Sequence, residues 1–289
     1  MIASEMPPAM HLESESSGGH CIAEIKENTS LVASLENLNL KSDQSPYFVD
    51  TEAKVASLVG RLQNLPTSPP SLYIDLEGVD LSRYGSISIL QIHILPLEET
   101  YLVDIHCLQE KAFSKMASDK GHNLLDILES PLIPKVFFDV RNDSDALFSH
   151  FNVKLAGVID LQLMELATRS FSRRYVNGLA KCIERDARLT TYEARCWKAS
   201  KEKGLELFAP ERGGSYEVFN ARPLPDDIKE YCMQDVQFLP KLWVQYHRKI
   251  SPSWARKVTA ESANRVLLSQ TATYDGKGKW KALAPVGWW

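Results

Sequence analysis

The 289-residue chain has few of the features that mark secreted, zinc-binding or membrane proteins. Its five cysteines are an odd number with no Cys-x-x-Cys pair, which argues against a disulfide framework and a zinc site. No apolar run approaches the roughly 20 residues that span a bilayer, and the chain's start lacks the basic and apolar stretches of a signal peptide. We therefore expect a soluble intracellular protein, nuclear or cytoplasmic, with free thiols and no membrane association.

The net charge is small, at -4, and it is unevenly distributed. The first 52 residues hold nine acidic and two basic residues, so the remainder carries 31 basic against 28 acidic residues. We interpret residues 1–46 as a disordered acidic leader, because Ser, Glu and Gly dominate much of it and little apolar surface offsets the entropy of ordering. A leucine stripe at Leu31, Leu35 and Leu38 could contact a protein partner, although so short a helix is marginal alone.

A pair of acids ends an apolar run in the segment SLYIDLEG. Asp75 and Glu77 are separated by one residue, so on a strand both side chains point to the same face. Two carboxylates on one face can form a cation site, whereas an unpaired buried carboxylate is costly. The alternative is that both are exposed residues at a strand end.

A second acidic cluster lies in KVFFDVRNDSDALFSHF. Its first part has strand character from Val136 to Asp139, and a helical pattern follows. The turn between them carries Asp139, Asp143 and Asp145. Asn142 or Asp143 could cap the helix, but capping does not account for all three acids.

The third cluster belongs to a helical pattern that starts at Pro225 and that we expect to form one long helix. Tyr231 and Asp235 are four residues apart, so a hydroxyl and a carboxylate project from the same helix face. Taken alone, the pair would be a core aromatic and a solvated acid.

In this order, the three clusters resemble the DEDDy branch of the DnaQ-like 3'-5' exonucleases. The resemblance covers roughly residues 47–250, includes GLAKCIERD and RPLPDDIKEYCMQDVQFLPKL, and looks like the ribonuclease D type. Within that group the second motif looks closest to the Egalitarian-like proteins. The resemblance implies the catalytic residues Asp75, Glu77, Asp143, Tyr231 and Asp235, of which the four acids would bind metal.

One departure from the family pattern concerns the second motif. Many active members have a His-Asn pair where this chain has Phe138 and Asp139, and Asp139 could approach the same cation as Asp143. Some Egalitarian-like relatives are thought to bind RNA without degrading it. The resemblance therefore implies a 3'-5' exonuclease acting on RNA or single-stranded DNA, with a catalytically weak or inactive nucleic-acid-binding adaptor as the alternative.

The residue types suit phosphodiester hydrolysis. Oxygen ligands without an accompanying His or Cys favour Mg²⁺ or Mn²⁺, and two such ions can hold the attacking and departing oxygens. The hydroxyl of a tyrosine has a pKa near 10, so we expect Tyr231 to orient a metal-bound water rather than to deprotonate it.

The coarse pattern predicts an α/β fold of the ribonuclease H-like class, with a mixed central sheet flanked by helices. We divide the chain into the leader (1–46), an exonuclease domain (47–250), and a C-terminal helix with a Trp- and Lys-containing tail (251–289). A basic stretch could bind phosphates or form a solvated helical face. Its residues are Arg169, Arg173, Arg174, Lys181, Arg185 and Arg188.

Overall fold

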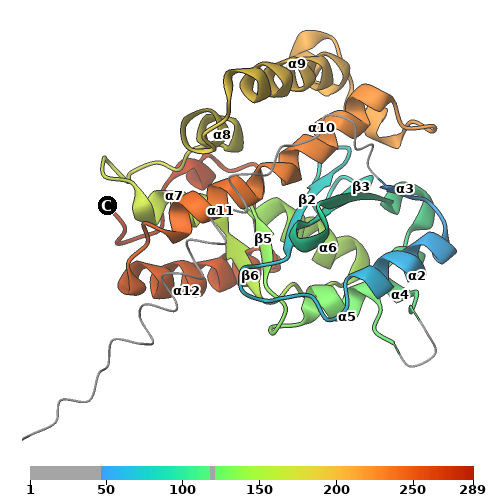
Figure 1. Cartoon of the computed structure of the whole chain (residues 1–289), viewed down its shortest axis with the longest axis horizontal. Coiled ribbons are helices and arrows are strands. Elements are labelled where there is room, and N and C mark those ends of the chain that lie inside the picture. The colour runs from blue at the N-terminus through green and yellow to red at the C-terminus, as the bar shows by residue number, and fades with distance from the viewer. Residues whose placement is uncertain (1–46, 118–120) are drawn as a thin grey trace, which may run out of the picture. The chain divides into compact units, whose positions relative to one another are not determined.

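A mixed six-stranded sheet organises the part of the chain that the computed structural model describes, residues 47–117 and 121–289 (Figure 1). The predicted leader and its leucine stripe lie outside these residues. Within them, no helix combines the length and the apolar character that crossing a bilayer requires.

The strand order is β1-β4-β3-β2-β5-β6. The strand β3 runs antiparallel to both of its neighbours, whereas the other three pairings are parallel. The strands are β1 (Tyr47–Val49), β2 (Leu72–Glu77), β3 (Ile89–Ile94), β4 (Glu99–Asp104), β5 (Lys135–Phe137) and β6 (Val158–Asp160). The predicted mixed central sheet flanked by helices is confirmed.

Helices cover both faces of the sheet, with α9 and α10 on one side and α2, α4 and α5 on the other (Figure 1). The helices up to α6 are α2 (Glu52–Arg61), α3 (Ile105–Leu108), α4 (Lys111–Ser114), α5 (Leu124–Glu129) and α6 (Arg141–Phe151). The later ones are α7 (Leu161–Thr168), α8 (Leu179–Asp186), α9 (Thr191–Phe208), α10 (Asp226–Gln237), α11 (Leu239–His247) and α12 (Pro252–Ser269).

The alternation along β2 separates the core from the acidic cluster. Leu72, Ile74 and Leu76 belong to the main hydrophobic core with residues of α2, α5 and α6. Asp75 and Glu77 point to the opposite face, because successive strand side chains alternate. The helix α10 packs on that face, where Ile89, Leu102 and Cys232 form a second, smaller core.

Three local predictions were wrong. The predicted long helix from Pro225 ends at Gln237, because Pro240 has no N–H to donate to the carbonyl of Val236, and α11 begins at Leu239. The apolar pattern from Val158 to Arg169 predicts one helix, whereas Val158–Asp160 pairs with β5 as a strand and α7 begins only at Leu161. The N-cap of α6 is Val140, with no side-chain cap from either Asn142 or Asp143.

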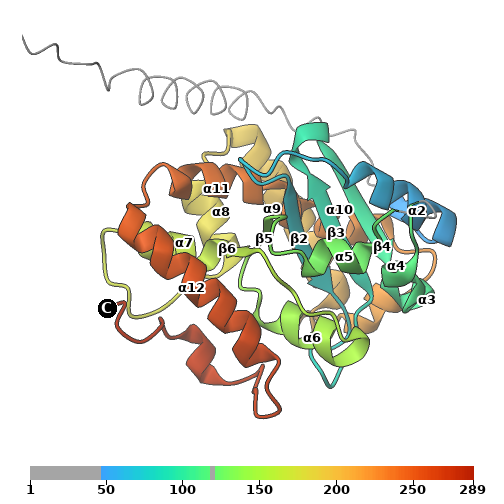
Figure 2. The ribbon, with the colours of Figure 1, turned by 90° about the horizontal axis from the view of Figure 1, so that it is seen from below.

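The C-terminal helix packs against the sheet edge and neighbouring helices. Figure 2 shows α12 alongside α7 and β6. The guanidinium of Arg265 lies 2.7 Å from the carboxylate of Asp160, and the hydroxyl of Ser262 accepts from the backbone N–H of Asp160. The rings of Trp254 and Trp288 are 5.1 Å apart, and Trp288 is buried.

Candidate active site

Three of the predicted acids lie together between β2 and α10. Carboxylate oxygens of Asp75, Glu77 and Asp235 are all within 4.8 Å of one another. Asp235 is buried, and the two acids of β2 are partly buried. The strand period places Asp75 and Glu77 side by side, and the packing of α10 across the sheet brings Asp235 to them.

The fourth acid, Asp143, approaches from the first turn of α6. It is buried, and its Oδ1 atom has no hydrogen-bond partner within the described structure. Burial raises the pKa of Asp143 to about 7, and the charges of Asp139 and Asp160 act in the same direction. Asp143 is also the neighbouring charge that most raises the pKa of Asp75, although it is not one of the three acids whose oxygens lie within 4.8 Å of one another.

The cluster is a concentration of like charges in a poorly solvated place. Burial raises the pKa values of Asp75, Glu77 and Asp235. Repulsion from the neighbouring carboxylates raises those of Asp75 and Glu77 further. Since like charges at this distance repel strongly, the arrangement favours a bound cation.

Tyr231 lies one helical turn before Asp235 and faces the same cluster. Its side chain is close enough to the carboxylates of Glu77 and Asp235 to lower the pKa values of both acids. Burial and the surrounding carboxylates raise the pKa of Tyr231 well above its usual value. The phenol is therefore protonated near neutral pH and acts as a hydrogen-bond donor.

Two residues of α9 complete the surroundings of Tyr231. The ammonium of Lys201 lies 5.4 Å from the centre of the Tyr231 ring, and its charge lowers the pKa values of Glu77 and Asp235. Gly204 lies directly against the ring, since a Cβ added there would be 2.6 Å from Cδ2 of Tyr231. The sequence pattern missed both residues, because their roles depend on how α9 packs against α10.

The other two acids of the second cluster are engaged elsewhere. Asp139 has a left-handed backbone and accepts from Arg141 at 2.7 Å, and Arg265 lies 3.5 Å away. Asp145 accepts from the side chain of Arg83 at 2.7 Å and from its backbone N–H at 2.9 Å. Both acids thus have cationic partners, whereas Asp143 has none within hydrogen-bond distance in the described residues.

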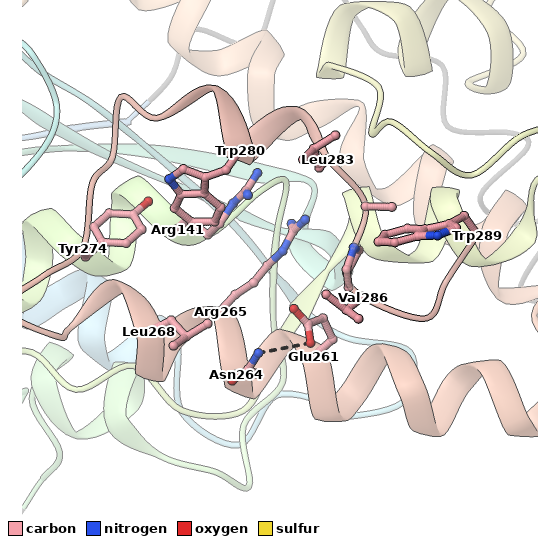
Figure 3. Close-up of a pocket in the computed structure, with 12 residues that line it drawn as sticks. Arg141, Glu261, Asn264, Arg265, Leu268, Tyr274, Trp280, Leu283, Val286 and Trp289 are labelled. Carbon is pink, nitrogen blue, oxygen red and sulfur yellow. Dashed lines mark hydrogen bonds between the residues drawn. The ribbon is translucent and has the colours of Figure 1, made fainter.

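The C-terminal tail covers the start of α6 next to Asp143. Lys281 donates to Oδ1 of Asn142 at 2.6 Å, and the hydroxyl of Tyr274 donates to the same atom at 3.0 Å. Figure 3 shows the adjoining pocket of about 420 Å³, where Arg141 and Arg265 lie between α12 and the tail, and Trp280 and Trp289 line it. The charge of Lys281 also lowers the pKa of Asp143, so the tail contributes to the electrostatics of the acid cluster.

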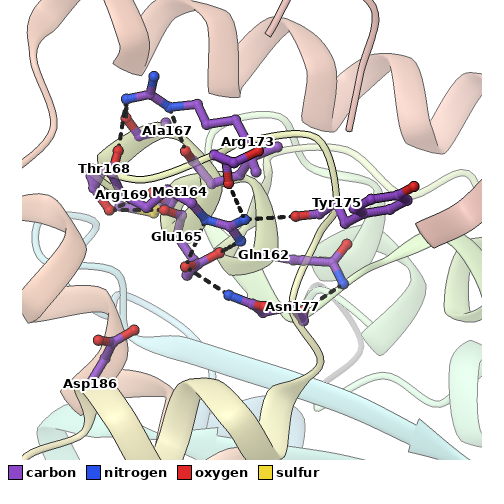
Figure 4. A network of polar contacts seen from close by, with 12 residues as sticks. Gln162, Met164, Glu165, Ala167, Thr168, Arg169, Arg173, Tyr175, Asn177 and Asp186 are labelled. Carbon is purple, nitrogen blue, oxygen red and sulfur yellow. Dashed lines mark hydrogen bonds and ion pairs between the residues drawn. The ribbon is translucent and has the colours of Figure 1, made fainter. Parts of the chain in front are cut away.

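Much of the predicted basic stretch is part of the internal structure. Arg169 and Arg185 form ion pairs with the buried carboxylate of Glu165, which also accepts from Asn177. Figure 4 shows this network, in which Arg173 donates to backbone carbonyls at the end of α7 and after it. These three arginines are held by protein groups and are not a free phosphate-binding surface.

A family model of the 3'-5' exonuclease domain matches residues 46–250, which include all five predicted site residues. The chain belongs to this exonuclease family. The family assignment supports a nuclease, and it places the acid cluster, the tyrosine and the sheet within the exonuclease domain. None of the curated proteins matches the sequence.

Solved nuclease structures share the fold. Trypanosoma brucei RNase D in complex with RNA U12 has a TM-score of 0.65 and 24% identity, over 85% of this chain and 78% of that one. Escherichia coli RNase D has a TM-score of 0.52 and 19% identity, over 80% of this chain and 52% of that one. Brucella melitensis NrnC with bound Mg²⁺ has a TM-score of 0.52 and 18% identity, over 82% of this chain and 100% of that one.

The acid cluster of the exonuclease domain has the chemistry that a hard divalent cation requires. Its ligand atoms are carboxylate oxygens, which Mg²⁺ and Mn²⁺ prefer over nitrogen or sulfur. The unpaired Oδ1 of Asp143 adds a buried acceptor that lacks a protein donor. A cation between these groups would satisfy the acceptor and relieve the repulsion that raises the carboxylate pKa values.

Proposed function

We propose that the protein is a metal-dependent 3'-5' exonuclease that removes nucleotides from the 3' end of RNA or single-stranded DNA. The observation that carries this proposal is the convergence of Asp75, Glu77 and Asp235, with oxygens within 4.8 Å, in a chain of the exonuclease family. The unpaired acid Asp143 supports it as the fourth ligand.

Asp75, Glu77, Asp143 and Asp235 would hold Mg²⁺ or Mn²⁺, with two ions at the site. Such ions acidify bound water and offset the negative charge that grows on a phosphate during hydrolysis. The protein's own contribution is to keep four carboxylates in a poorly solvated pocket where they are costly without a cation. The NrnC structure with bound Mg²⁺ supports the choice of ion.

The protonated hydroxyl of Tyr231 would position the attacking water. A phenol whose pKa lies well above 10 cannot serve as the base near neutral pH, but it can donate a hydrogen bond. It lies on the same face of α10 as Asp235, close enough to Glu77 and Asp235 to lower their pKa values, and so beside the oxygens that would bind the ions. We therefore assign Tyr231 an orienting role.

RNA is the substrate we propose to test first. The RNase D of Trypanosoma brucei, which shares the fold, forms a complex with RNA U12. The resemblance of the second motif to Egalitarian-like proteins stays a prediction, and so does a protein partner that binds through the leader.

The test uses single-stranded RNA labelled at its 5' end, incubated with purified protein and Mn²⁺. We expect a ladder of products that shorten one nucleotide at a time, and a circular RNA of the same sequence should stay intact. Asp75→Asn should lower the rate about 10²- to 10³-fold, the range for losing a group that stabilises transition-state charge. Asp226→Asn is the matched control, because Asp226 is an exposed acid at the start of α10 and should not affect the rate.

A second variant tests the role of Tyr231. Tyr231→Phe should lower kcat about 10²-fold, as expected when one proton-transfer or water-orienting group is lost. The dissociation constant for Mn²⁺, measured by calorimetry, should be unchanged. RNA that binds in a salt-dependent manner but is never shortened would reject the proposal and favour the adaptor function.

A further inference from the structure

Gln91 lies next to the acid cluster and has an unusual environment. It sits in β3 directly opposite Asp75 of β2, in the antiparallel pairing of the two strands. Opposed residues of neighbouring strands point to the same face, with Cβ atoms about 5 Å apart. The amide of Gln91 is therefore on the face where α10 packs and where the carboxylates converge.

The side chain of Gln91 is fully buried and its amide is unsatisfied. Neither Oε1 nor Nε2 has a hydrogen-bond partner within the described structure. The thiol of Cys232 is close enough for the amide to lower its pKa, but a thiol is a weak partner and completes no hydrogen bond here. Leaving both ends of a buried amide without partners costs folding free energy.

The neighbours of Gln91 show that this position has no intrinsic need for a polar side chain. Ile89 on the same strand and Leu102 on β4 point to the same face, and both belong to the smaller core. An aliphatic residue at position 91 would pack there without the cost of the unpaired amide. An unsatisfied polar group beside the candidate ion site instead indicates that the amide has a partner in the metal-bound protein.

We propose that Gln91 is a positioning residue whose amide holds the Asp75 carboxylate in its cation-binding orientation. This inference rests on the proposed function. A carboxylate that binds a cation through one oxygen can accept a hydrogen bond on the other, and such supporting bonds orient metal ligands in proteins. The Nε2 group of Gln91 is a donor with no hydrogen bond in the described residues, and Asp75 is its cross-strand neighbour.

The test compares Gln91→Met with the wild-type protein. Methionine has a similar length and fills the space, but it cannot donate a hydrogen bond. We expect the Mn²⁺ dissociation constant, measured by electron paramagnetic resonance of the free ion, to rise about tenfold or more. Without metal, the midpoint of urea unfolding should be equal or higher, because an unsatisfied amide is removed.

Tyr73→Phe is the matched control. The hydroxyl of Tyr73 is also buried and unpartnered, on the same face of β2, and Tyr73 pairs with His93 rather than with an acid. Its removal should likewise maintain or raise the urea midpoint, but Mn²⁺ binding should be unchanged.

The outcomes separate this inference from the proposed function. If the wild-type protein binds no Mn²⁺, the proposed function fails, and the inference about Gln91 fails with it. If the wild type binds Mn²⁺ and Gln91→Met binds it equally well, only the role of Gln91 is rejected. A Gln91→Met protein that unfolds at lower urea without weaker Mn²⁺ binding would also reject it, and would make the amide a structural group. If that variant does not fold, Gln91→Leu replaces it with the same expectations.

Discussion

At the scale of single residues, the main feature is a set of carboxylates that the fold holds together at an electrostatic cost. Asp143 illustrates it, because burial raises its pKa to about 7 and its Oδ1 has no hydrogen-bond partner in the described structure. A carboxyl whose pKa is higher in the folded than in the unfolded protein stabilises the fold at low pH. That contribution is complete below the unfolded value of 3.8 and is lost as the pH rises through about 7.

The metal-free protein should therefore respond to Asp143→Asn in a pH-dependent way. At pH 8 with EDTA, the variant should be more stable than the wild type by on the order of a few kcal/mol, because the buried charge is gone. At pH 5 the gain should shrink, since Asp143 is then protonated in the folded wild type. Urea unfolding of both proteins at each pH measures the difference, in which groups that do not interact with Asp143, such as His93, cancel. A gain that is equal at both pH values would contradict the assignment.

The sequence predicted the members of the acid cluster but not everything around them. Strand periodicity and the Tyr-x-x-x-Asp spacing are local properties, so the orientations of Asp75 with Glu77 and of Tyr231 with Asp235 could be predicted. Lys201 and Gln91 could not be found in this way. Their places depend on helix packing and on strand register, which bring together residues that are distant in the chain.

At the scale of elements, the contact between α9 and α10 controls the position of Tyr231. Gly204 lets the two helices approach until the tyrosine ring fills the space where a side chain would be. Packing between elements also explains two wrong predictions. Pro240 divides into two helices a segment whose apolar pattern predicted one. Val158–Asp160 is a strand because it pairs with β5, and a three-residue segment has too short a pattern to predict this.

Gly204→Ala should displace the ring of Tyr231. The added Cβ would lie 2.6 Å from Cδ2 of Tyr231, so α9 or the ring must move. We expect a loss of about 1–3 kcal/mol of stability, as for other overpacked cores, together with a lower kcat. Urea unfolding and the RNA-shortening assay measure the two effects. Gly60→Ala in α2 is the control, because its Cβ would meet nothing within 4 Å, and it should add up to about 1 kcal/mol.

The link between Asp145 and Arg83 connects α6 to the loop after β2 and to the end of α12. Arg83 also donates to the carbonyls of Ser269 and Thr271, at 2.8 Å each. Asp145→Ala would leave the largely buried guanidinium of Arg83 without its carboxylate partner, which costs about 3–5 kcal/mol in similar cases.

Chemical denaturation measures this loss, and Asp227→Asn serves as the comparison. Asp227 forms an exposed pair with Lys203, so its removal should change stability by less than about 0.5 kcal/mol. Equal effects of the two substitutions would show that the Arg83 link has no structural importance.

At the scale of the whole molecule, the segment beyond the family match is part of the structure that supports the site. The match ends at residue 250, whereas the described residues before and after this point belong to one compact unit. The buried carboxylate of Asp160 pairs with Arg265 of α12 at 2.7 Å, and Lys281 of the tail donates to Asn142. The domain boundary at residue 250 stays a prediction. Residues on its two sides, such as Asp160 and Arg265, are in direct contact.

Two shortened chains test this dependence. A chain of residues 42–289 should unfold in urea at the same midpoint as the full chain and should keep its activity. A chain of residues 42–250 should show no cooperative transition, because loss of Arg265 leaves Asp160 buried and unpaired and the α12 face of the sheet edge is exposed. Circular dichroism during urea titration measures both, and an equal midpoint for the two chains would reject the dependence.

The position of Arg265 in the chain has a consequence for synthesis. All five predicted site residues leave the ribosome before Arg265 does. Asp139 and Asp160, whose charges raise the pKa of Asp143, both lie within 3.5 Å of Arg265, which belongs to α12. A nascent or prematurely stopped polypeptide would thus contain every predicted site residue but lack the arginine that pairs with Asp139 and Asp160.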